Sequence, residues 1–180
     1  HLVCFYTSRA NEKHNDDGGE SMLEDTSFAI RPVDQTDEAE RWQPIGHVQK
    51  IEGKKQIFAF TCERASGKIH FYRDDIVRVT IDPFAQKYVS VSPAVVATPE
   101  KVDVRVREEE NGWTLQTKQL TVIIERSPFR LAIYDQEGTL LVRDVQPVCF
   151  EAKGRMRCTH ALAPTDVVYG LGEKTGVLNK

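Results

Sequence analysis

The chain has 180 residues and a mass of 20.4 kDa, and its residues are 40% hydrophobic and 28% charged, a composition typical of one globular domain. No stretch approaches the roughly 20 apolar residues of a membrane-spanning helix, so the sequence predicts no membrane partner. The net charge of −3 and the pI near 6.0 argue against a nucleic-acid partner, because a dedicated nucleic-acid-binding domain usually has a pI above about 9.

The first part of the chain is acidic and polar. Residues 1–44 hold 4 Lys/Arg and 10 Asp/Glu, a net charge of −6, whereas residues 45–180 hold 20 and 17, a net charge of +3. The run from Asn11 to Glu20 has no apolar residue, so it cannot bury enough surface to offset the entropy of ordering it. We therefore expect residues 1–21 to be a flexible lead-in of native or non-native origin, and residues 22–44 to be an acidic linker or extended segment. Met22 is either the native start or an ordinary internal methionine.

From Ile45 onward the sequence has a period of two residues, as in β-strands. Val102, Val104 and Val106, for example, alternate with charged residues and predict a half-buried strand, and the hairpin turn Asn111-Gly112 follows it. Residues 120–124 are continuously apolar or β-branched, which predicts a strand covered on both faces. The predicted strands are residues 56–62, 68–72, 76–81, 102–106, 113–117, 120–124, 129–133, 139–142, 148–152 and 155–161.

The pattern after Pro44 contains no helical stripe ten residues long. Many short strands without intervening helices are typical of an antiparallel β-sandwich or barrel. The predicted fold class is therefore all-β, with residues 45–180 as one domain.

The cysteines and histidines indicate no metal site and no cofactor. Neither C-x-x-C, HxH nor HxxxH spacing occurs, and His70 lies between Ile69 and Phe71 on an alternating strand and faces away from both. We expect four free thiols in a reducing, cytoplasmic compartment; two disulfides of a secreted protein are the alternative. The cysteines are Cys4, Cys62, Cys149 and Cys158, and the histidines are His1, His14, His47, His70 and His160.

Two runs of adjacent carboxylates, Asp74-Asp75 and Glu108–Glu110, were candidates for acid–base chemistry. Glycoside hydrolysis needs two carboxyl groups that flank the scissile bond, about 5–10 Å apart. Neighbours on a strand point to opposite faces instead, so we interpret both runs as solvated strand ends. No nucleophile elbow of the G-x-S-x-G type occurs either.

The most unusual string is YGLGEKTGVLNK, residues 169–180. It lacks the third glycine of G-x-G-x-x-G, and Glu173 stands where a P-loop ending in Lys-Thr requires glycine. Three glycines in seven residues indicate backbone that passes where side chains do not fit.

This string closely resembles a motif in the N-terminal β-sandwich of glycoside hydrolase family 31, which contains α-glucosidases and α-xylosidases. Residues 71–79 (FYRDDIVRV) and 127–135 (SPFRLAIYD) resemble two strands of the family in the same order, and residues 22–30 (MLEDTSFAI) resemble the start of bacillus-type members. The resemblance implies a galactose mutarotase-like sandwich, incomplete at its C-terminal end. A structural role is implied for the motif residues Tyr169, Gly170, Gly172, Glu173, Lys174, Thr175, Gly176 and Asn179.

The resemblance also implies which residues carry the chemistry. In this family the nucleophile and the acid/base are aspartates on a (β/α)₈ barrel that follows the sandwich, and the chain stops before any counterpart. We therefore expect a catalytically incompetent fragment of an α-glucosidase whose partners are α-glucosides or α-gluco-oligosaccharides, with the oligomeric state left open.

Two other functional classes remain: a free-standing carbohydrate-binding β-sandwich and a structural β-domain that mediates assembly. A sugar-binding platform needs exposed aromatic rings, and the candidates are Trp42, Trp113, Tyr72 and Tyr88, each of which is otherwise a packing residue.

Overall fold

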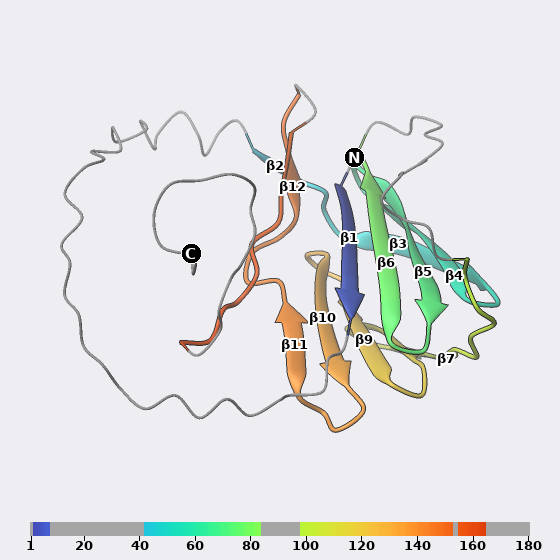
Figure 1. Cartoon of the computed structure of the whole chain (residues 1–180). Helices are drawn as coiled ribbons and strands as arrows, with labels where there is room; N and C mark the ends of the chain where they lie inside the picture. Colours follow the sequence, from blue (N-terminus) through green and yellow to red (C-terminus); the bar gives the residue numbers. More distant parts are fainter. Residues whose placement is uncertain (1, 8–41, 84–97, 153–154, 165–180) are drawn as a thin grey trace, which may run out of the picture.

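The computed structural model describes residues 2–7, 42–83, 98–152 and 155–164, and all regular structure in these ranges is β-strand (Figure 1). The all-β prediction is therefore confirmed. No helix among the described residues is long and apolar enough to span a membrane.

Two five-stranded antiparallel sheets form the sandwich, and a small sheet lies beside them (Figure 1). The first sheet has the order β1 (Leu2–Thr7), β6 (Ile76–Asp82), β5 (Ser66–Arg73), β4 (Ile57–Cys62) and β3 (Val48–Lys54). The second sheet has the order β11 (Leu140–Arg143), β10 (Arg130–Asp135), β9 (Leu120–Glu125), β8 (Gly112–Gln116) and β7 (Arg105–Glu109). The third sheet has the order β13 (Met156–Arg157), β12 (Cys149–Phe150) and β2 (Gln43–Pro44).

The period of two residues in the sequence becomes the core of the sandwich. In β4, Phe58 and Phe60 are buried while the alternate residues Ile57 and Ala59 are exposed, because successive side chains of a strand point to opposite faces. A similar alternation occurs in β5 and β9, and buried side chains of both large sheets form one hydrophobic cluster. Its largest fully buried members are Phe60, Phe71, Phe129, Ile45, Ile69, Ile81, Leu115, Leu120, Ile124 and Ile133.

One short segment, Ile45–Val48, connects all three sheets. Ile45 N donates a hydrogen bond to Val148 O (3.0 Å) beside the third sheet, and Val48 N donates to Arg126 O (2.8 Å) beside the second. The chain then enters β3 of the first sheet. The segment therefore ties the edges of the sandwich together through its backbone.

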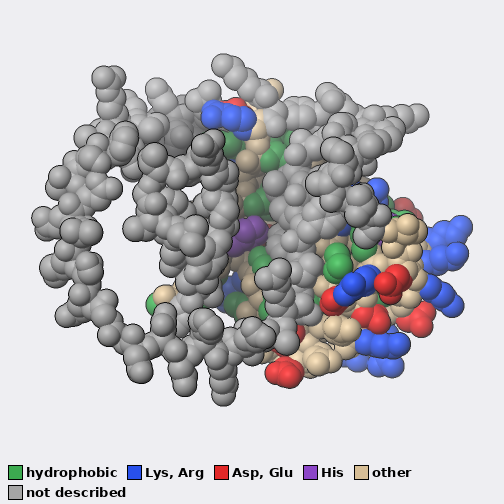
Figure 2. All heavy atoms as spheres, in the orientation of Figure 1, with side chains coloured by type: hydrophobic (Ala, Val, Ile, Leu, Met, Phe, Trp, Pro, Cys, Tyr) green, Lys and Arg blue, Asp and Glu red, His purple; other side chains and the backbone are tan. Residues whose placement is uncertain are grey.

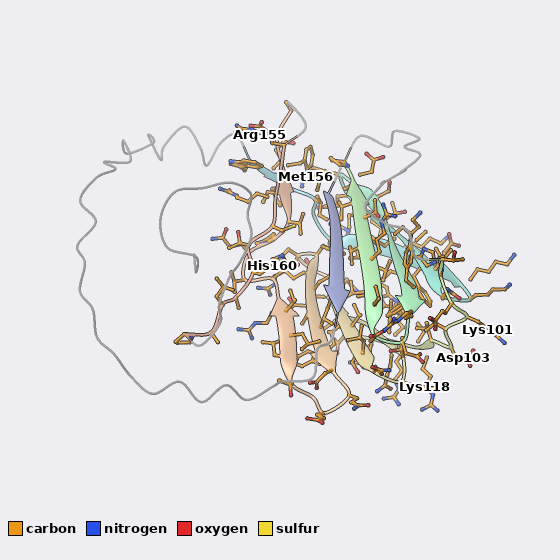
Figure 3. All side chains as sticks on the ribbon, in the orientation of Figure 1. Lys101, Asp103, Lys118, Arg155, Met156 and His160 are labelled. Carbon is orange, nitrogen blue, oxygen red and sulfur yellow. The ribbon has the colours of Figure 1, made fainter. Side chains whose placement is uncertain are left out.

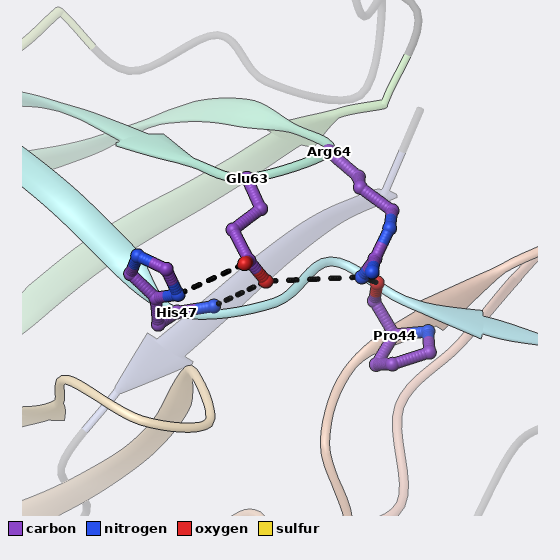
Figure 4. A network of polar contacts seen from close by, with 4 residues as sticks. All are labelled: Pro44, His47, Glu63 and Arg64. Carbon is purple, nitrogen blue, oxygen red and sulfur yellow. Dashed lines mark hydrogen bonds and ion pairs between the residues drawn. The ribbon is translucent and has the colours of Figure 1, made fainter.

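The turn between β4 and β5 holds this segment in place (Figure 4). The carboxylate of Glu63 accepts a hydrogen bond from His47 N (3.3 Å) and lies 3.1 Å from His47 Nδ1, and Arg64 Nη1 donates to Pro44 O (2.9 Å). Gly46 between these contacts has a φ of +88°, and a Cβ there would lie 2.0 Å from Glu63 Oε2. Only glycine combines this backbone conformation with so close an approach.

The structure differs from the sequence-based expectation at the ends of several elements. Val106 is 48% exposed although it lies opposite buried Leu115, because it belongs to the outermost strand of its sheet. Thr121 and Ile123 in β9 are half-buried rather than covered. The two candidate strands near the end of the chain shrink to the two-residue strands β12 and β13.

The structure of the first residues also differs from the sequence-based expectation. Leu2–Thr7 form β1, which pairs antiparallel with β6 over six residues, although residues 1–21 were expected to be flexible. Residues 8–41, including Asn11–Glu20 and the expected linker up to residue 41, lie outside the described residues. The next described residue is Trp42, and β2 begins directly after it at Gln43.

Candidate functional site

Trp113, one of the four candidate aromatic residues for sugar binding, is almost completely buried. Trp113 is 6% exposed, and the guanidinium of Arg126 covers its ring at 4.1 Å from the centroid. A ring that is buried on one side and stacked on a cation serves packing. Tyr88 lies outside the described residues.

Trp42 is half-buried beside the third sheet, next to two arginines. The guanidinium carbon of Arg157 lies 4.6 Å from the centroid of the Trp42 ring, and that of Arg155 lies 5.8 Å away. Arg155 also pairs with Glu151, whose side chain is 1% exposed, through Nε to Oε1 and through Nη2 to Oε2 (2.9 Å). These contacts make Trp42 part of a cation–π and ion-pair cluster that holds the third sheet.

Tyr72 and His70 form a ring pair on the outer face of the first sheet, with centroids 4.5 Å apart. His70 faces away from buried Ile69 and Phe71, as the alternation predicts. Arg78, opposite His70 on β6, donates from Nη1 to the Tyr72 hydroxyl at 3.3 Å. These contacts join His70, Tyr72 and Arg78 into one polar and aromatic cluster on the outer face.

A shallow groove of about 560 Å³ runs along this outer face between β3, β4 and β5. Its floor includes Ile57, which is 40% exposed, and His70, which lies opposite it. Burial lowers the pKa of His70 below its ordinary value, and the cations of Lys68 and Arg78 lower this pKa further. A neutral imidazole presents one donor and one acceptor, so this face can hydrogen-bond a hydroxyl group but holds no acid–base pair of its own. The groove is lined by Glu52, Gly53, Lys54, Lys55, Gln56, Ile57, Ala59 and His70.

The adjacent carboxylates take part in local pairs. Asp75 accepts two hydrogen bonds from Arg73 (2.9 and 2.7 Å), and these bonds lower the pKa of Asp75. Glu108 accepts one from Arg126 at 2.9 Å. The lowered pKa of Asp75 favours its ionised form, which does not suit this residue to the role of a general acid.

One buried polar pair, Asp144 and His160, was not predicted from the sequence. Asp144 is 4% exposed; its Oδ2 accepts a hydrogen bond from Leu131 N (2.8 Å), and its Oδ1 lies 2.9 Å from Nδ1 of His160. Burial raises the pKa of Asp144 above its ordinary value. No spacing in the sequence joins these residues, because an isolated bridge outside the named strands brings them together. The pair connects the end of the second sheet to the segment after β13.

All motif residues, Tyr169 to Asn179, lie outside the described residues, so their predicted structural role stays a prediction. Within the described ranges, no group of three or more His, Cys, Asp or Glu side chains is placed to hold a metal ion.

Comparison with known proteins decides the family. Residues 66–180 match the sequence profile of the glycosyl hydrolase 31 N-terminal galactose mutarotase-like domain. The chain belongs to this family. The resemblance that the motifs carried is therefore confirmed.

A curated relative agrees with this family-31 assignment. The chain is 43% identical over 162 residues to "Alpha-glucosidase 2" of Bacillus thermoamyloliquefaciens, and the match covers 88% of this chain and 20% of the relative. The family-31 domain described here thus spans about a fifth of that relative's length.

Solved structures share the family-31 sandwich. A GH31 dextranase of Flavobacterium johnsoniae, complexed with glucose, has a TM-score of 0.68 at 25% identity and matches 76% of this chain and 18% of its own. A cycloalternan-forming enzyme from Listeria monocytogenes, in complex with a pentasaccharide substrate, has a TM-score of 0.63 at 16% identity and matches 77% of this chain and 14% of its own. The second likeness concerns the fold alone.

Proposed function

We propose that this chain is the accessory N-terminal domain of an α-glucosidase that hydrolyses terminal α-linked glucose with retention of configuration. The observation that carries the proposal is the 43% identity to a relative named an α-glucosidase, over most of this chain. The structural likeness to a dextranase complexed with glucose supports α-glucosides and α-gluco-oligosaccharides as the substrates of the whole protein.

The local chemistry supports an accessory role for this chain. A retaining glycosidase places two carboxyl groups about 5–5.5 Å apart, one as nucleophile and one as acid and then base. Among the described residues, the carboxylates of Asp75, Glu108 and Glu151 are paired with arginines. We therefore assign both catalytic carboxylates to other parts of the whole protein, with the sandwich as a rigid neighbour of the catalytic domain.

An assay on aryl glycosides tests this proposal. Full-length protein and the 180-residue chain are each incubated with an aryl α-glucoside and an aryl α-xyloside, and aglycone release is measured. We expect turnover of the glucoside by the full-length protein alone. Comparable turnover by the 180-residue chain would overturn the accessory role, and preference for the xyloside would overturn the substrate. A full-length protein that binds α-glucan without hydrolysis would favour a carbohydrate-binding module instead.

We further propose a cytoplasmic location for the protein, with all four cysteines reduced. Cys62, Cys149 and Cys158 are thiols in the structure, and Cys62 is buried. Burial, together with the charge of Glu63, raises the pKa of Cys62 to about 12, so its thiol is inert in the folded state. Thiol titration in denaturant without reductant should count four groups. In the folded chain, without denaturant, Cys62 should not react. A count of two or none would contradict the reducing compartment.

A further inference from the structure

A second, larger groove of about 920 Å³ opens at one end of the sandwich. The turn between β3 and β4, the segment that leads into β7 and the turn between β8 and β9 line it, and Figure 3 shows Lys101, Asp103 and Lys118 at this end. Its volume lies in the range of about 300–1,000 Å³ that is typical of ligand sites. The lining residues are Lys55, Gln56, Pro99, Glu100, Lys101, Val102, Asp103, Val104, Arg105, Gln116, Thr117 and Lys118.

Gln56 holds the wall of this groove in one conformation. Its side-chain Nε2 donates hydrogen bonds to Phe71 O (3.0 Å) and Glu100 O (2.6 Å), while its Oε1 accepts one from Val102 N (3.2 Å). On the other side, Thr117 Oγ1 donates to Asp74 O at 2.6 Å. Because both walls are bonded to the first sheet, the charged side chains project from a fixed frame.

Four cationic side chains line this groove, on the side of the molecule where Lys, Arg, Asp and Glu side chains gather in Figure 2. Lys55, Lys101, Arg105 and Lys118 are all exposed, and the structure records no ion pair between any of them and another described residue. Elsewhere in the described part, arginines such as Arg73, Arg126 and Arg130 pair with carboxylates. Four cations in one concave surface, none of them paired with a carboxylate of the described residues, concentrate positive potential there.

Two carboxylates, Glu100 and Asp103, also lie in the groove and narrow the choice of ligand. They reduce the local charge from +4 to +2, and they repel a ligand that consists of anionic groups alone. A ligand that carries both anionic groups and hydroxyl donors matches the cations and the carboxylates together. The chain as a whole has a net charge of −3, so attraction of a polyanion has to be local.

We propose that this groove binds an acidic polysaccharide, that is, a sugar chain with sulfate, phosphate or carboxylate groups. Lys55, Lys101, Arg105 and Lys118 contact the anionic groups, and Glu100 and Asp103 accept hydrogen bonds from sugar hydroxyls. The site is a docking surface and carries no bond-breaking step.

Binding of fluorescent dextran sulfate to the 180-residue chain, measured by anisotropy at low and high salt, tests this proposal, with neutral dextran of equal length as the comparison. The double variant Lys101→Gln/Lys118→Gln should bind dextran sulfate roughly tenfold more weakly, since exposed charge pairs contribute modestly each. Higher salt should weaken binding of the unaltered chain by screening, and it should weaken binding of this variant less.

The matched control is the double variant Lys50→Gln/Lys68→Gln, which removes the same charge from the outer face of the first sheet, where both lysines are exposed. It should bind as the unaltered chain does. Circular dichroism checks that both variants fold. The proposal is overturned by absence of binding at low salt, by equal binding of neutral dextran, or by equal loss in the control. Binding of polyglutamate that is as tight, with the same dependence on Lys101 and Lys118, would replace the polysaccharide by an acidic peptide and also overturn it.

Discussion

The rings of Phe60 and Phe129 stack across the interior of the sandwich, with centroids 4.9 Å apart and planes 20° from parallel. Phe60 belongs to β4 of the first sheet, and Phe129 directly precedes β10 of the second. Both side chains are at most 2% exposed. The pair therefore joins the two large sheets at the centre of the hydrophobic core.

Replacement of either ring should destabilise the domain strongly. We expect Phe129→Ala to lower the free energy of unfolding by about 3–5 kcal/mol, since it removes a buried ring and leaves a cavity. The double variant with Phe60→Ala should deviate from additivity by about 0.5–1.5 kcal/mol because the rings contact each other. Urea unfolding measures these values, and Val106→Ala at an exposed position should change stability by less than about 0.5 kcal/mol. An additive double variant would show that the stacking contributes nothing beyond burial.

Gly46→Ala tests the close approach between Gly46 and Glu63. Two costs combine: the φ of +88° is unfavourable for alanine, and the new Cβ would meet the Glu63 side chain. We expect a loss of about 2–3 kcal/mol in thermal or urea unfolding. Gly138→Ala is the matched control, since Gly138 has a φ of +83° but no atom within 4 Å of its added Cβ. The Gly138→Ala variant should lose about 1 kcal/mol. Equal losses at both positions would show that the approach of Glu63 to Gly46 adds no steric cost.

The buried carboxylate of Glu151 makes its partner Arg155 important for stability. Arg155→Ala leaves a carboxylate that is 1% exposed without this partner, and we expect a loss of about 3 kcal/mol because the charge of Glu151 is then buried without the arginine. Lys50→Ala provides the contrast, because Lys50 and Glu52 are 63% and 68% exposed and such pairs contribute about 0–1 kcal/mol. Chemical denaturation of both variants gives the comparison. A loss for Arg155→Ala no greater than that for Lys50→Ala would mean that Glu151 is held by its other contacts.

His70 should make stability depend on pH below its ordinary pKa. Burial and the nearby cations lower the pKa of His70 in the folded state from the ordinary value of 6.5, so the unfolded chain takes up a proton at a higher pH than the folded chain does. The neutral imidazole therefore contributes fully above pH 6.5, and stability is lost as the pH falls from that value towards the lowered pKa.

The measurement for His70 compares the unaltered chain with His70→Gln by urea unfolding between about pH 5 and pH 8. The stability of the unaltered chain relative to His70→Gln should decline as the pH falls. The contact with Tyr72 adds a constant difference that does not affect this slope. A relative stability that rises towards low pH would contradict the direction of the pKa shift.

The sequence was sufficient for most of the sandwich because its long strands bury one face each. Phe58, Phe60 and Cys62 in β4 alternate with exposed residues, and this period alone indicates both the strand and its inward face. The Asn-Gly signal correctly indicates a hairpin between β7 and β8, although the two turn residues are Glu110 and Asn111 and Gly112 begins β8.

The remaining features depend on contacts between distant parts of the chain. β2 pairs Pro44 with Cys149 and Gln43 with Phe150, and strands of two residues are too short to show a period. Val106 has the pattern of a core residue, but its exposure follows from its place in an edge strand, which the pattern does not contain. Asp144 and His160, and the Gln56 side chain that orders the end groove, are likewise joined only by the fold.

The segment from Ile45 to Val48 has a consequence for how the domain opens. Since its amides bond to Val148 O and Arg126 O, and its Gly46 O accepts from Phe129 N at 3.0 Å, no sheet can separate from the others while this backbone stays in place. The three sheets then behave as one cooperative unit rather than as independently fraying parts. The amide protons of Ile45, Val48 and Phe129 are expected to exchange with solvent only when the whole sandwich unfolds, at the slowest rates in the domain.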